Sequence, residues 1–425
     1  MKNKKETLLI LTILITMCII IFNRDKLYEA KYIEPKDTLL AITINGEIST
    51  TFPTTNAYTG TVECTTGTGK VEWNGTKWIL TTSGITKGST KCNATFNQTL
   101  RQAILANNEV KAPITTPGAA ISTVDEALLA SAEDDYGTSY YFRGAVTNNY
   151  VEFANKCWRI VRVGGDGSVK LILHNDNTAG ATNPCDSANN STSAAFARYS
   201  GTTYKSAFNS SYNDNAHVGF KYGTASASTY ADTHANTNNS TILTNLETWY
   251  NNNLKTYADA ITDTVWCNDK TNVTDTTFNP YGYSNVNGLG YAKNATYYGA
   301  TQRLASTSNS PGGTGPSLKC NGELSKINSK VGLITADELA LAGYTYAKNN
   351  TTTYLQENAT NTYWWSLSPG YFYSYYAYVW YVDGSIGYFG HHVGNAGGVR
   401  PSISLKPSTN VTGDGTSSSP FIINM

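Results

Sequence analysis

The sequence predicts an α+β protein in which one large mixed domain follows a small all-β module and an N-terminal membrane helix. Three features support this fold class. Residues 8–22 form an apolar run behind a basic start, residues 38–98 contain strand-like runs separated by Asn-Gly turns, and residues 136–407 combine strand-like runs with two helical patterns. With 425 residues, the chain is long enough for two or three domains with cores of their own.

The N-terminal segment has the charge order of an export signal. Lys2, Lys4 and Lys5 precede the apolar run from Leu8 to Phe22, and no Ala-x-Ala-like cleavage site follows it. About twenty residues cross the hydrocarbon of a bilayer, so a run of this length spans it only if its flanking side chains reach the interface. We therefore expect residues 1–24 to be an uncleaved single-pass membrane anchor and residues 25–37 a charged stalk, with the rest of the chain outside the cell.

Residues 38–98 have the pattern of a small β-sandwich. Asn74-Gly75 joins the strand-like Val71–Trp73 to Lys77–Ile79, which is the strongest short hairpin signal. Cys64 and Cys92 flank this hairpin. These features predict an immunoglobulin-like spacer module held by one disulfide.

Residues 99–135 are expected to form a linker. Helical patterns at Leu100–Ala106 and Val124–Ala132 are separated by Pro113 and Pro117, which break the chain between them. At the other end of the chain, residues 408–425 are rich in Gly, Ser and Thr, so we expect a tail that closes with a short strand.

The large domain from residue 136 to residue 407 has three well-marked local elements. Gly164–Gly167 turns the strand-like Trp158–Val163 back into Val169–Leu173. Ser240 is a plausible N-cap for an amphipathic helix that extends toward Ile261. Thr335 and Glu338 have the spacing of a capping box, which predicts a second helix that ends near Gly343.

Six cysteines follow Cys18, and an even number in an exported chain indicates disulfides. Six cysteines allow fifteen pairings. The pairs that we predict are Cys64–Cys92, Cys267–Cys320 and Cys157–Cys185. No CxxC spacing occurs and the histidines are dispersed apart from His391-His392, so we expect neither a metal site nor a cofactor.

Several short motifs, taken in order, resemble a known domain family. The segment Gly332–Ala342 resembles the motif that opens a helix in formylglycine-generating-enzyme-like domains, although Ile334 replaces the proline of that motif. Gly398–Leu405 resembles the Gly-x-Arg strand that closes these domains, and Trp364–Pro369 stands where they carry a Trp-bearing strand. The openings Tyr140–Tyr150 and Cys157–Arg162 are similar to those of a family of bacterial surface proteins.

This resemblance implies a C-type-lectin-like binding domain over residues 136–407. The enzymatic branch of the family needs a reactive cysteine pair late in the domain, and no cysteine follows Cys320, so that oxidase activity is excluded. The sugar-binding calcium loops of the C-type lectin fold carry Glu-Pro-Asn-like or Gln-Pro-Asp-like tripeptides, and neither tripeptide occurs here.

An aromatic cluster near the C-terminus is the strongest candidate for a binding surface. The chain contains 30 Tyr residues, and exposed clusters of this kind mark interaction sites. We expect one exposed patch formed by Tyr371, Tyr373, Tyr375, Tyr376, Tyr378, Tyr381, Tyr388, Phe389, His391 and His392.

The segment around this cluster, residues 366–400, contains no Lys, Glu, Gln or Met. Adenine-directed mutagenesis of Asn codons leaves such a composition, so the segment resembles the variable region of C-type-lectin-fold proteins that diversity-generating retroelements modify. A fixed set of Tyr- and Gly-rich loops is the alternative.

Composition and motifs limit the classes of function. The net charge is zero and only 15% of residues are charged, which argues against a nucleic-acid partner. No catalytic motif is found, and the acidic pairs Asp134-Asp135 and Asp337-Glu338 are interpreted as a loop and a helix cap. We therefore expect a bacterial cell-surface protein that binds a protein or glycan on another cell, a host surface or a phage. The alternatives are an extracellular glycan-cleaving enzyme and a structural envelope or pilus-like subunit.

Overall fold

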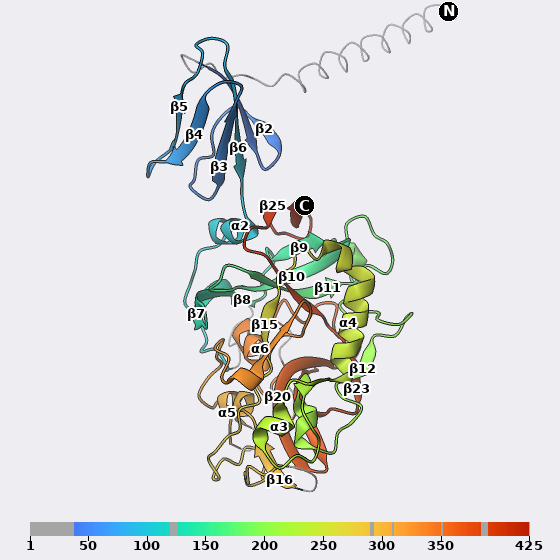
Figure 1. Ribbon diagram of the computed structural model, residues 1–425. Helices are drawn as coiled ribbons and strands as arrows, with labels where there is room; N and C mark the ends of the chain where they lie inside the picture. Colours follow the sequence, from blue (N-terminus) through green and yellow to red (C-terminus); the bar gives the residue numbers. More distant parts are fainter. Residues whose placement is uncertain are drawn as a thin grey trace, which may run out of the picture. The chain divides into compact units, whose positions relative to one another are not determined.

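The computed structural model describes residues 38–119, 126–289, 293–307, 310–349, 352–383 and 390–424. The fold is mixed α+β, mostly strands with few helices, as the sequence predicts (Figure 1). The chain divides between Gln98 and Thr99 into two compact units. The expected membrane anchor and stalk lie outside the described residues.

The first unit is a four-stranded sheet covered by a hairpin. The sheet has the order β2-β1-β6-β3, and β1 and β6 are parallel. The strands are β1 (Leu39–Ile44), β2 (Glu47–Ser49), β3 (Thr59–Cys64), β4 (Thr68–Trp73), β5 (Trp78–Ser83) and β6 (Lys91–Asn97). β4 and β5 form the predicted Asn-Gly hairpin, and Val71 and Trp78 from it pack on Leu40, Ala94 and Phe96 of the sheet.

The disulfide of this unit differs from the immunoglobulin-like prediction. Cys64 and Cys92 are bonded, as expected, but they are directly opposed residues of the neighbouring strands β3 and β6. In an immunoglobulin domain the disulfide connects two facing sheets. The bond found here instead fixes the register of two strands within one sheet.

The second unit contains an eight-stranded sheet. Its main path has the order β24-β11-β10-β9-β26-β25, and β8 and β7 extend from β10. The strands are β7 (Ala127–Asp134), β8 (Gly137–Gly144), β9 (Tyr150–Phe153), β10 (Lys156–Val163), β11 (Val169–Asn175), β24 (Ser402–Leu405), β25 (Asn410–Thr412) and β26 (Phe421–Asn424). The predicted β10–β11 hairpin is confirmed.

Two segments expected to be a linker and a tail contribute to this unit. The helix expected at Val124–Ala132 is wrong, because Ala127–Asp134 pairs as a strand with β8 along its whole length. Its eight residues form backbone hydrogen bonds with β8, and this pairing outweighs local helix propensity. β25 and β26 likewise add to the sheet beside β9. The predicted helix near residue 100 is confirmed as α2 (Leu100–Asn107), with Leu100 and Ile104 buried.

A second, six-stranded sheet carries the aromatic cluster. Its order is β12-β23-β20-β21-β22, with β16 beside β20. These strands are β12 (Lys205–Ala207), β16 (Lys293–Tyr297), β20 (Trp364–Ser374), β21 (Tyr376–Val382), β22 (His391–His392) and β23 (Ala396–Gly398). β20 and β21 form a tight hairpin, and Ser374 at its turn has a positive φ of 57°.

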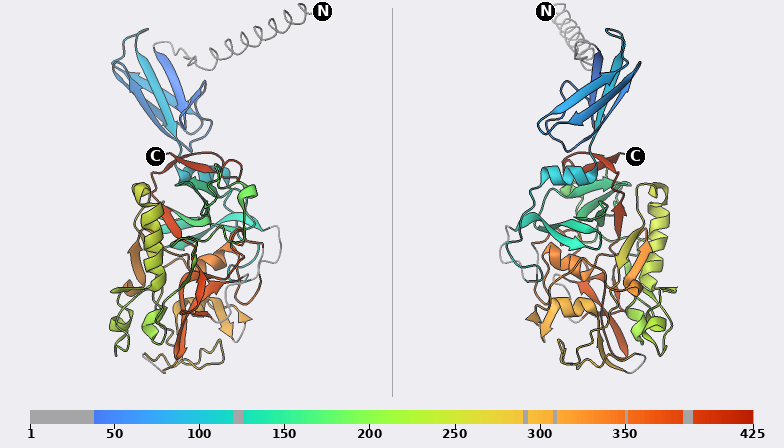
Figure 2. Two further views of the ribbon diagram at one scale, coloured as in Figure 1. Left: turned by 90° about the vertical axis from the view of Figure 1, so that its right-hand side faces the viewer. Right: turned by 60° about the vertical axis from the view of Figure 1, so that its left-hand side comes forward.

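The two predicted helices of this unit are confirmed. α4 (Thr241–Asn253) starts after the N-cap Ser240 and lies along one side of the unit (Figures 1 and 2). α6 (Ala336–Ala342) has the full capping box and ends at Gly343, whose φ is 116°. The other short elements are α3 (Tyr230–His234), α5 (Gly299–Leu304), η1 (Ser187–Asn189), η2 (Asn215–Val218), η3 (Lys255–Tyr257), η4 (Glu323–Ser325), β13 (Lys221–Tyr222), β14 (Asn238–Asn239), β15 (Thr264–Cys267), β17 (Ala305–Thr307), β18 (Ser310–Pro311) and β19 (Lys326–Ser329).

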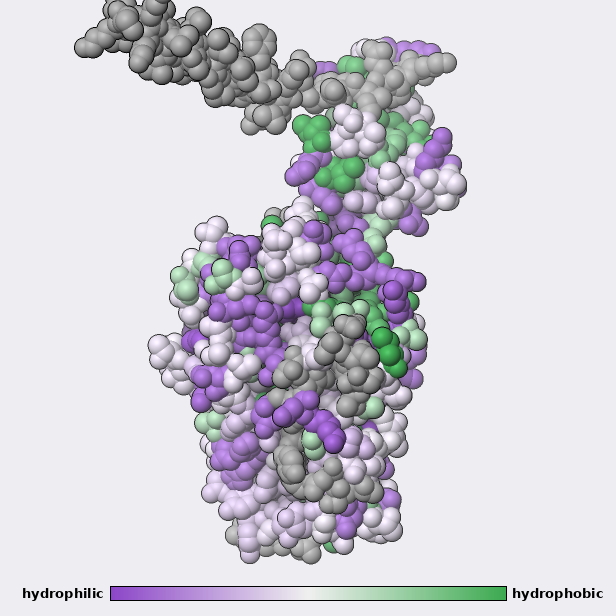
Figure 3. Space-filling model, turned by 180° about the vertical axis from the view of Figure 1, so that it is seen from behind, coloured by the Kyte–Doolittle hydropathy of each residue, from purple (hydrophilic) through white to green (hydrophobic). Residues whose placement is uncertain are grey.

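All three predicted disulfides are present, namely Cys64–Cys92, Cys157–Cys185 and Cys267–Cys320. Disulfides persist in oxidising compartments, so they are consistent with an extracellular protein. Within the described ranges, no helix is long and apolar enough to cross a membrane. The face of the second unit seen in Figure 3 is mainly hydrophilic, with few hydrophobic residues.

Candidate functional site

The hairpin β20–β21 does not place the predicted aromatic residues in one patch. Tyr376 and Tyr378 point to one face of β21, while Val379 and Tyr381 point to the other, because side chains alternate along a strand. His392 lies on the same face as Tyr376 and Tyr378, and its ring is 4.5 Å from that of Tyr376. His391 follows the second face, where it lies 5.0 Å from the ring of Tyr381.

Exposure divides the predicted residues further. Tyr375 and Tyr376 are exposed, at 47% and 41%, whereas Tyr371 and Tyr381 are buried, at 4% and 7%. The expectation of exposure is therefore wrong for Tyr371 and Tyr381. Tyr373, Tyr378, His391 and His392 are half-buried. Tyr388 and Phe389 lie outside the described residues.

The buried ring of Tyr371 packs against tyrosines from its own hairpin and from two other segments. It stacks on Tyr378 at 4.4 Å with parallel planes, and it packs against Tyr281 and Tyr297 at 5.0 and 5.7 Å. Burial raises the pKa of the Tyr371 hydroxyl, so this residue stays neutral at physiological pH. The half-buried Tyr378 is therefore packed against a layer of buried tyrosine rings.

Two loops remote in sequence add rings that the sequence analysis missed. Tyr212 is 41% exposed, and its ring lies 4.7 Å from that of His392 and 5.7 Å from that of Tyr376. Its carbonyl oxygen accepts a hydrogen bond from Ala377 of β21. Tyr283 stacks on Tyr373 at 3.8 Å. Single tyrosines in Asn- and Ser-rich loops carry no local signal, so only the folded chain identifies them.

These rings form what we call the aromatic surface, which consists of Tyr212, Tyr283, Tyr373, Tyr375, Tyr376, Tyr378 and His392. Its neighbourhood in sequence is almost free of charge, since Asp383 is the only Asp, Glu, Lys or Arg between Ser366 and Val399. Burial and the neighbouring His391 lower the pKa of His392, which keeps this ring neutral as well. The surface therefore presents neutral rings and hydroxyl groups.

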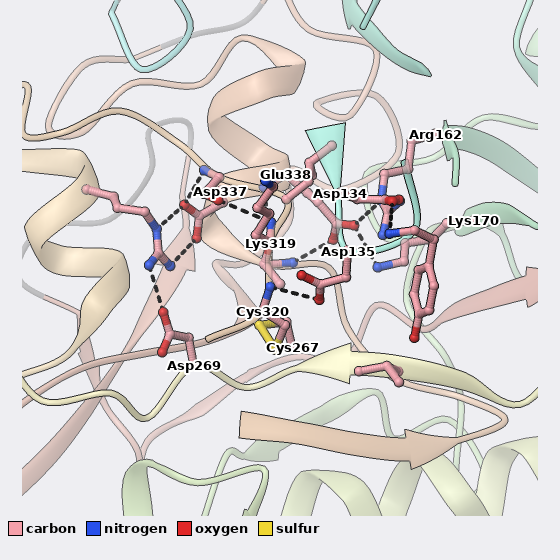
Figure 4. Close-up of a pocket in the computed structure, with 16 residues that line it drawn as sticks. Asp134, Asp135, Arg162, Lys170, Cys267, Asp269, Lys319, Cys320, Asp337 and Glu338 are labelled. Carbon is pink, nitrogen blue, oxygen red and sulfur yellow. Dashed lines mark hydrogen bonds and ion pairs between the residues drawn. A yellow bond between two sulfur atoms is a disulfide. The ribbon is translucent and has the colours of Figure 1, made fainter. Parts of the chain in front are cut away.

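A second candidate site is a charged pocket beside α6, with a cavity of about 40 Å³ (Figure 4). On one side, Arg162 contacts Asp134 and Glu338 at 2.9 Å each, and the Lys170 ammonium lies 2.6 Å from Glu338. On the other side, Arg303 contacts Asp269 at 2.7 Å and Asp337 at 2.6 Å. The disulfide Cys267–Cys320 lies between the two groups.

The ion pairs in this pocket dominate its electrostatics. Burial would raise the pKa of Glu338, but the nearby Lys170 and Arg162 outweigh it and hold that pKa at about 2. Glu338 also caps α6 through the backbone N–H of Thr335, as the sequence predicts. A cavity of this size has room for only a few water molecules. The ion pairs of this pocket therefore hold α6 against β10 and β11. The sequence analysis interpreted these acids as a loop and a helix cap and did not predict their ion pairs.

In the described part of the chain, no group of three or more His, Cys, Asp or Glu residues is arranged to hold a metal ion. No protein-family model matches the chain, and no curated protein or solved structure matches it either.

Proposed function

We propose that this chain is an extracellular ligand-binding protein that contacts its ligand through the aromatic surface. The observation that carries the proposal is the convergence of exposed rings from three separate segments. Tyr212 and Tyr283 come from two loops, and Tyr376 comes from the β20–β21 hairpin. The ring of Tyr212 packs on those of Tyr376 and His392, and the ring of Tyr283 packs on that of Tyr373. Exposing so much aromatic area costs solvation free energy that a binding partner recovers.

The chemistry of the surface favours a neutral contact region on the ligand. Tyrosine supplies a large contact area with little loss of side-chain entropy, and the surrounding Asn, Ser and Gly residues supply hydrogen bonds. Ring packing below the surface reduces the ordering cost further, because Tyr378 is already held by Tyr371. Since charged residues are scarce here, we expect binding to depend little on salt concentration.

The remaining parts of the proposal follow from the sequence. Residues 1–24 would anchor the protein in the membrane, and residues 38–98 would act as a spacer. The second unit would be a C-type-lectin-like domain of a bacterial surface protein, with residues 366–400 as a segment open to diversification. The exposed Tyr375 and Tyr376 at the β20–β21 turn support this last point, because substitutions there leave the core intact.

A glycan-cleaving activity lacks comparable support. Two carboxylates that flank a glycosidic bond must face a cleft that admits the substrate. The carboxylates gathered beside α6, which include Asp134, Asp337 and Glu338, are instead engaged in ion pairs around a cavity of about 40 Å³. A structural envelope subunit would instead contact other copies of the chain and would not bind the glycans or cells used as probes in the test below.

The test is a binding comparison with the full chain, using a glycan array and intact cells as probes. We expect Tyr212→Ala and Tyr376→Ala each to weaken binding by about 2 kcal/mol or more if these rings are hot spots. Tyr136→Ala is the matched control, because Tyr136 is 60% exposed and lies outside the aromatic surface. Equal binding by all three variants would contradict the proposal, as would release of reducing sugar ends from the array.

A further inference from the structure

Two arginine side chains are buried close to each other in the second unit with only one carboxylate between them. Arg159 of β10 is 1% exposed and Arg400 is fully buried. Glu357 contacts Arg159 at 3.3 Å, and its own side chain is 40% exposed. Among the described residues, the hydrogen-bond acceptors of Arg400 are the carbonyl oxygens of Leu173 and Leu355. A buried ion without a counter-ion is costly, so this cluster carries an excess of positive charge that needs compensation.

Four buried nitrogen or oxygen atoms around Arg400 have no hydrogen-bond partner within the described structure. They are Nη2 of Arg400 itself, Nδ1 of His174, the hydroxyl of Tyr354 and Nε1 of Trp364. Guanidinium and indole nitrogens can only donate, and a tyrosine hydroxyl donates readily. Buried polar atoms are almost always paired, so four unpaired atoms in one cluster need an explanation.

The fourth atom, Nδ1 of His174, belongs to a ring close to both arginines. The amide of Asn358 is oriented by its contacts, because its oxygen accepts from the Ser191 N–H while its nitrogen donates to the carbonyl of His174. The same nitrogen also donates to the side-chain oxygen of Asn190, so oxygen atoms accept both of its hydrogens, and it lies 3.2 Å from Nε2 of His174. Burial, together with Arg159 and Arg400, lowers the pKa of His174 well below its usual range. The ring is therefore neutral.

These groups form one cluster. The guanidinium carbon of Arg400 lies 4.9 Å from the centre of the Trp364 ring, and that of Arg159 lies 5.3 Å from the Tyr354 ring. The rings of Tyr150 and His174 are 5.3 Å apart, and Tyr150 lies under Arg159 at 3.7 Å. Cation–π contacts offset part of the burial cost, but they supply no full negative charge.

We propose that this cluster, which we call the Arg400 cluster, binds a small monovalent inorganic anion such as chloride. A halide accepts hydrogen bonds from several directions, so it matches a set of donors that lacks an acceptor. It also balances the second guanidinium, which a water molecule cannot do. Glu357 connects the cluster to solvent through its exposed side chain. The anion would tie together β10, β11 and the segment that carries Tyr354, and it is independent of the aromatic surface.

The first test is thermal unfolding of the full chain in sodium chloride and in sodium gluconate at equal ionic strength. Gluconate is too large for a buried site. A ligand that binds only the folded state raises the Tm with the logarithm of its concentration, by about 1–3 °C at ten times its Kd for a protein of this size. Identical Tm values in the two salts at every concentration would overturn the proposal.

A pair of variants separates an anion from ordered water. Tyr354→Phe removes one donor, so the chloride-dependent rise in Tm becomes smaller if the anion is present. If no anion binds, the variant loses only an unpaired hydroxyl, and its Tm changes equally in both salts. Tyr250→Phe is the matched control, because the buried Tyr250 hydroxyl also lacks a partner but is outside the Arg400 cluster. We expect it to keep the full chloride effect.

Anomalous scattering from crystals grown in bromide provides a direct readout. A bromide peak in contact with Nη2 of Arg400 would support the proposal, and a water peak without anomalous signal at that place would overturn it.

Discussion

The charged pocket beside α6 and the aromatic surface at the β20–β21 hairpin belong to the same unit but differ in chemistry. The first consists of charged side chains and the second of neutral aromatic rings. Around α6, Glu338 and Lys170 are buried, and Glu338 lies within 3 Å of both Lys170 and the half-buried Arg162. At the hairpin, Tyr375 and Tyr376 are exposed and neutral. Buried ion pairs hold an element in one position, because moving it would leave a buried charge without its partner at a large cost in free energy. The exposed rings of the aromatic surface lie where the protein contacts solvent or a partner.

Removal of the central acid of the charged pocket should have the largest effect on stability. In Glu338→Gln, Lys170 loses its carboxylate and Arg162 keeps only Asp134. Breaking a buried ion pair costs about 3–5 kcal/mol in the free energy of unfolding, which denaturant titration measures. Glu323→Gln is the control, because that pair with Lys326 is at the surface and should matter little. If both variants unfold at the same denaturant concentration, the pocket does not clamp α6.

Acid should weaken the same pocket. The pKa of Glu338 is about 2 in the folded state, against 4.5 as its ordinary value. Because the folded pKa is the lower one, this contribution to stability is complete above about pH 4.5 and is lost as the pH falls toward 2. Its size is on the order of 3 kcal/mol. Unfolding measured near pH 5 and pH 2.5 should differ less in Glu338→Gln than in the wild type; an equal pH dependence would contradict the assignment.

The disulfide that lies in the charged pocket should contribute slightly less. Cys267 and Cys320 are 53 residues apart in sequence, so their bond restricts a long loop of the unfolded chain. Replacing both by Ser should lower the free energy of unfolding by about 2–4 kcal/mol. Binding through the aromatic surface should persist under conditions where the variant is folded. A loss of binding by the folded variant would mean that the two regions are coupled.

The smallest effect is expected on the aromatic surface itself. Tyr376→Ala should change the free energy of unfolding by less than about 0.5 kcal/mol, because the ring is 41% exposed. Tyr371→Ala, on the neighbouring strand β20, should cost about 3 kcal/mol, because the ring is buried among other tyrosines. Similar costs at both positions would show that Tyr376 belongs to the core rather than to a binding surface.

Elements that depend on a few neighbouring residues could be predicted from the sequence alone. The Asn74-Gly75 hairpin, the Thr335–Glu338 capping box and the C-cap at Gly343 are such cases. Each is determined by hydrogen bonds or backbone angles within about four residues, so no distant partner is needed. The three disulfide pairs were also predicted, because their cysteines lie within single structural units.

Tertiary structure decided everything that depends on distant partners. Ala127–Asp134 is a strand because it pairs with β8, although the local pattern favoured a helix. The tyrosines of residues 371–381 are chemically alike, and only the strand pairing determines that Tyr371 is buried and Tyr376 exposed. Tyr212 joins them from more than 150 residues away, and Arg400 comes close to Arg159 from more than 200 residues away. Composition alone identified the chain as rich in tyrosine, but the direction of each ring is set by its neighbours in space, which local sequence does not encode.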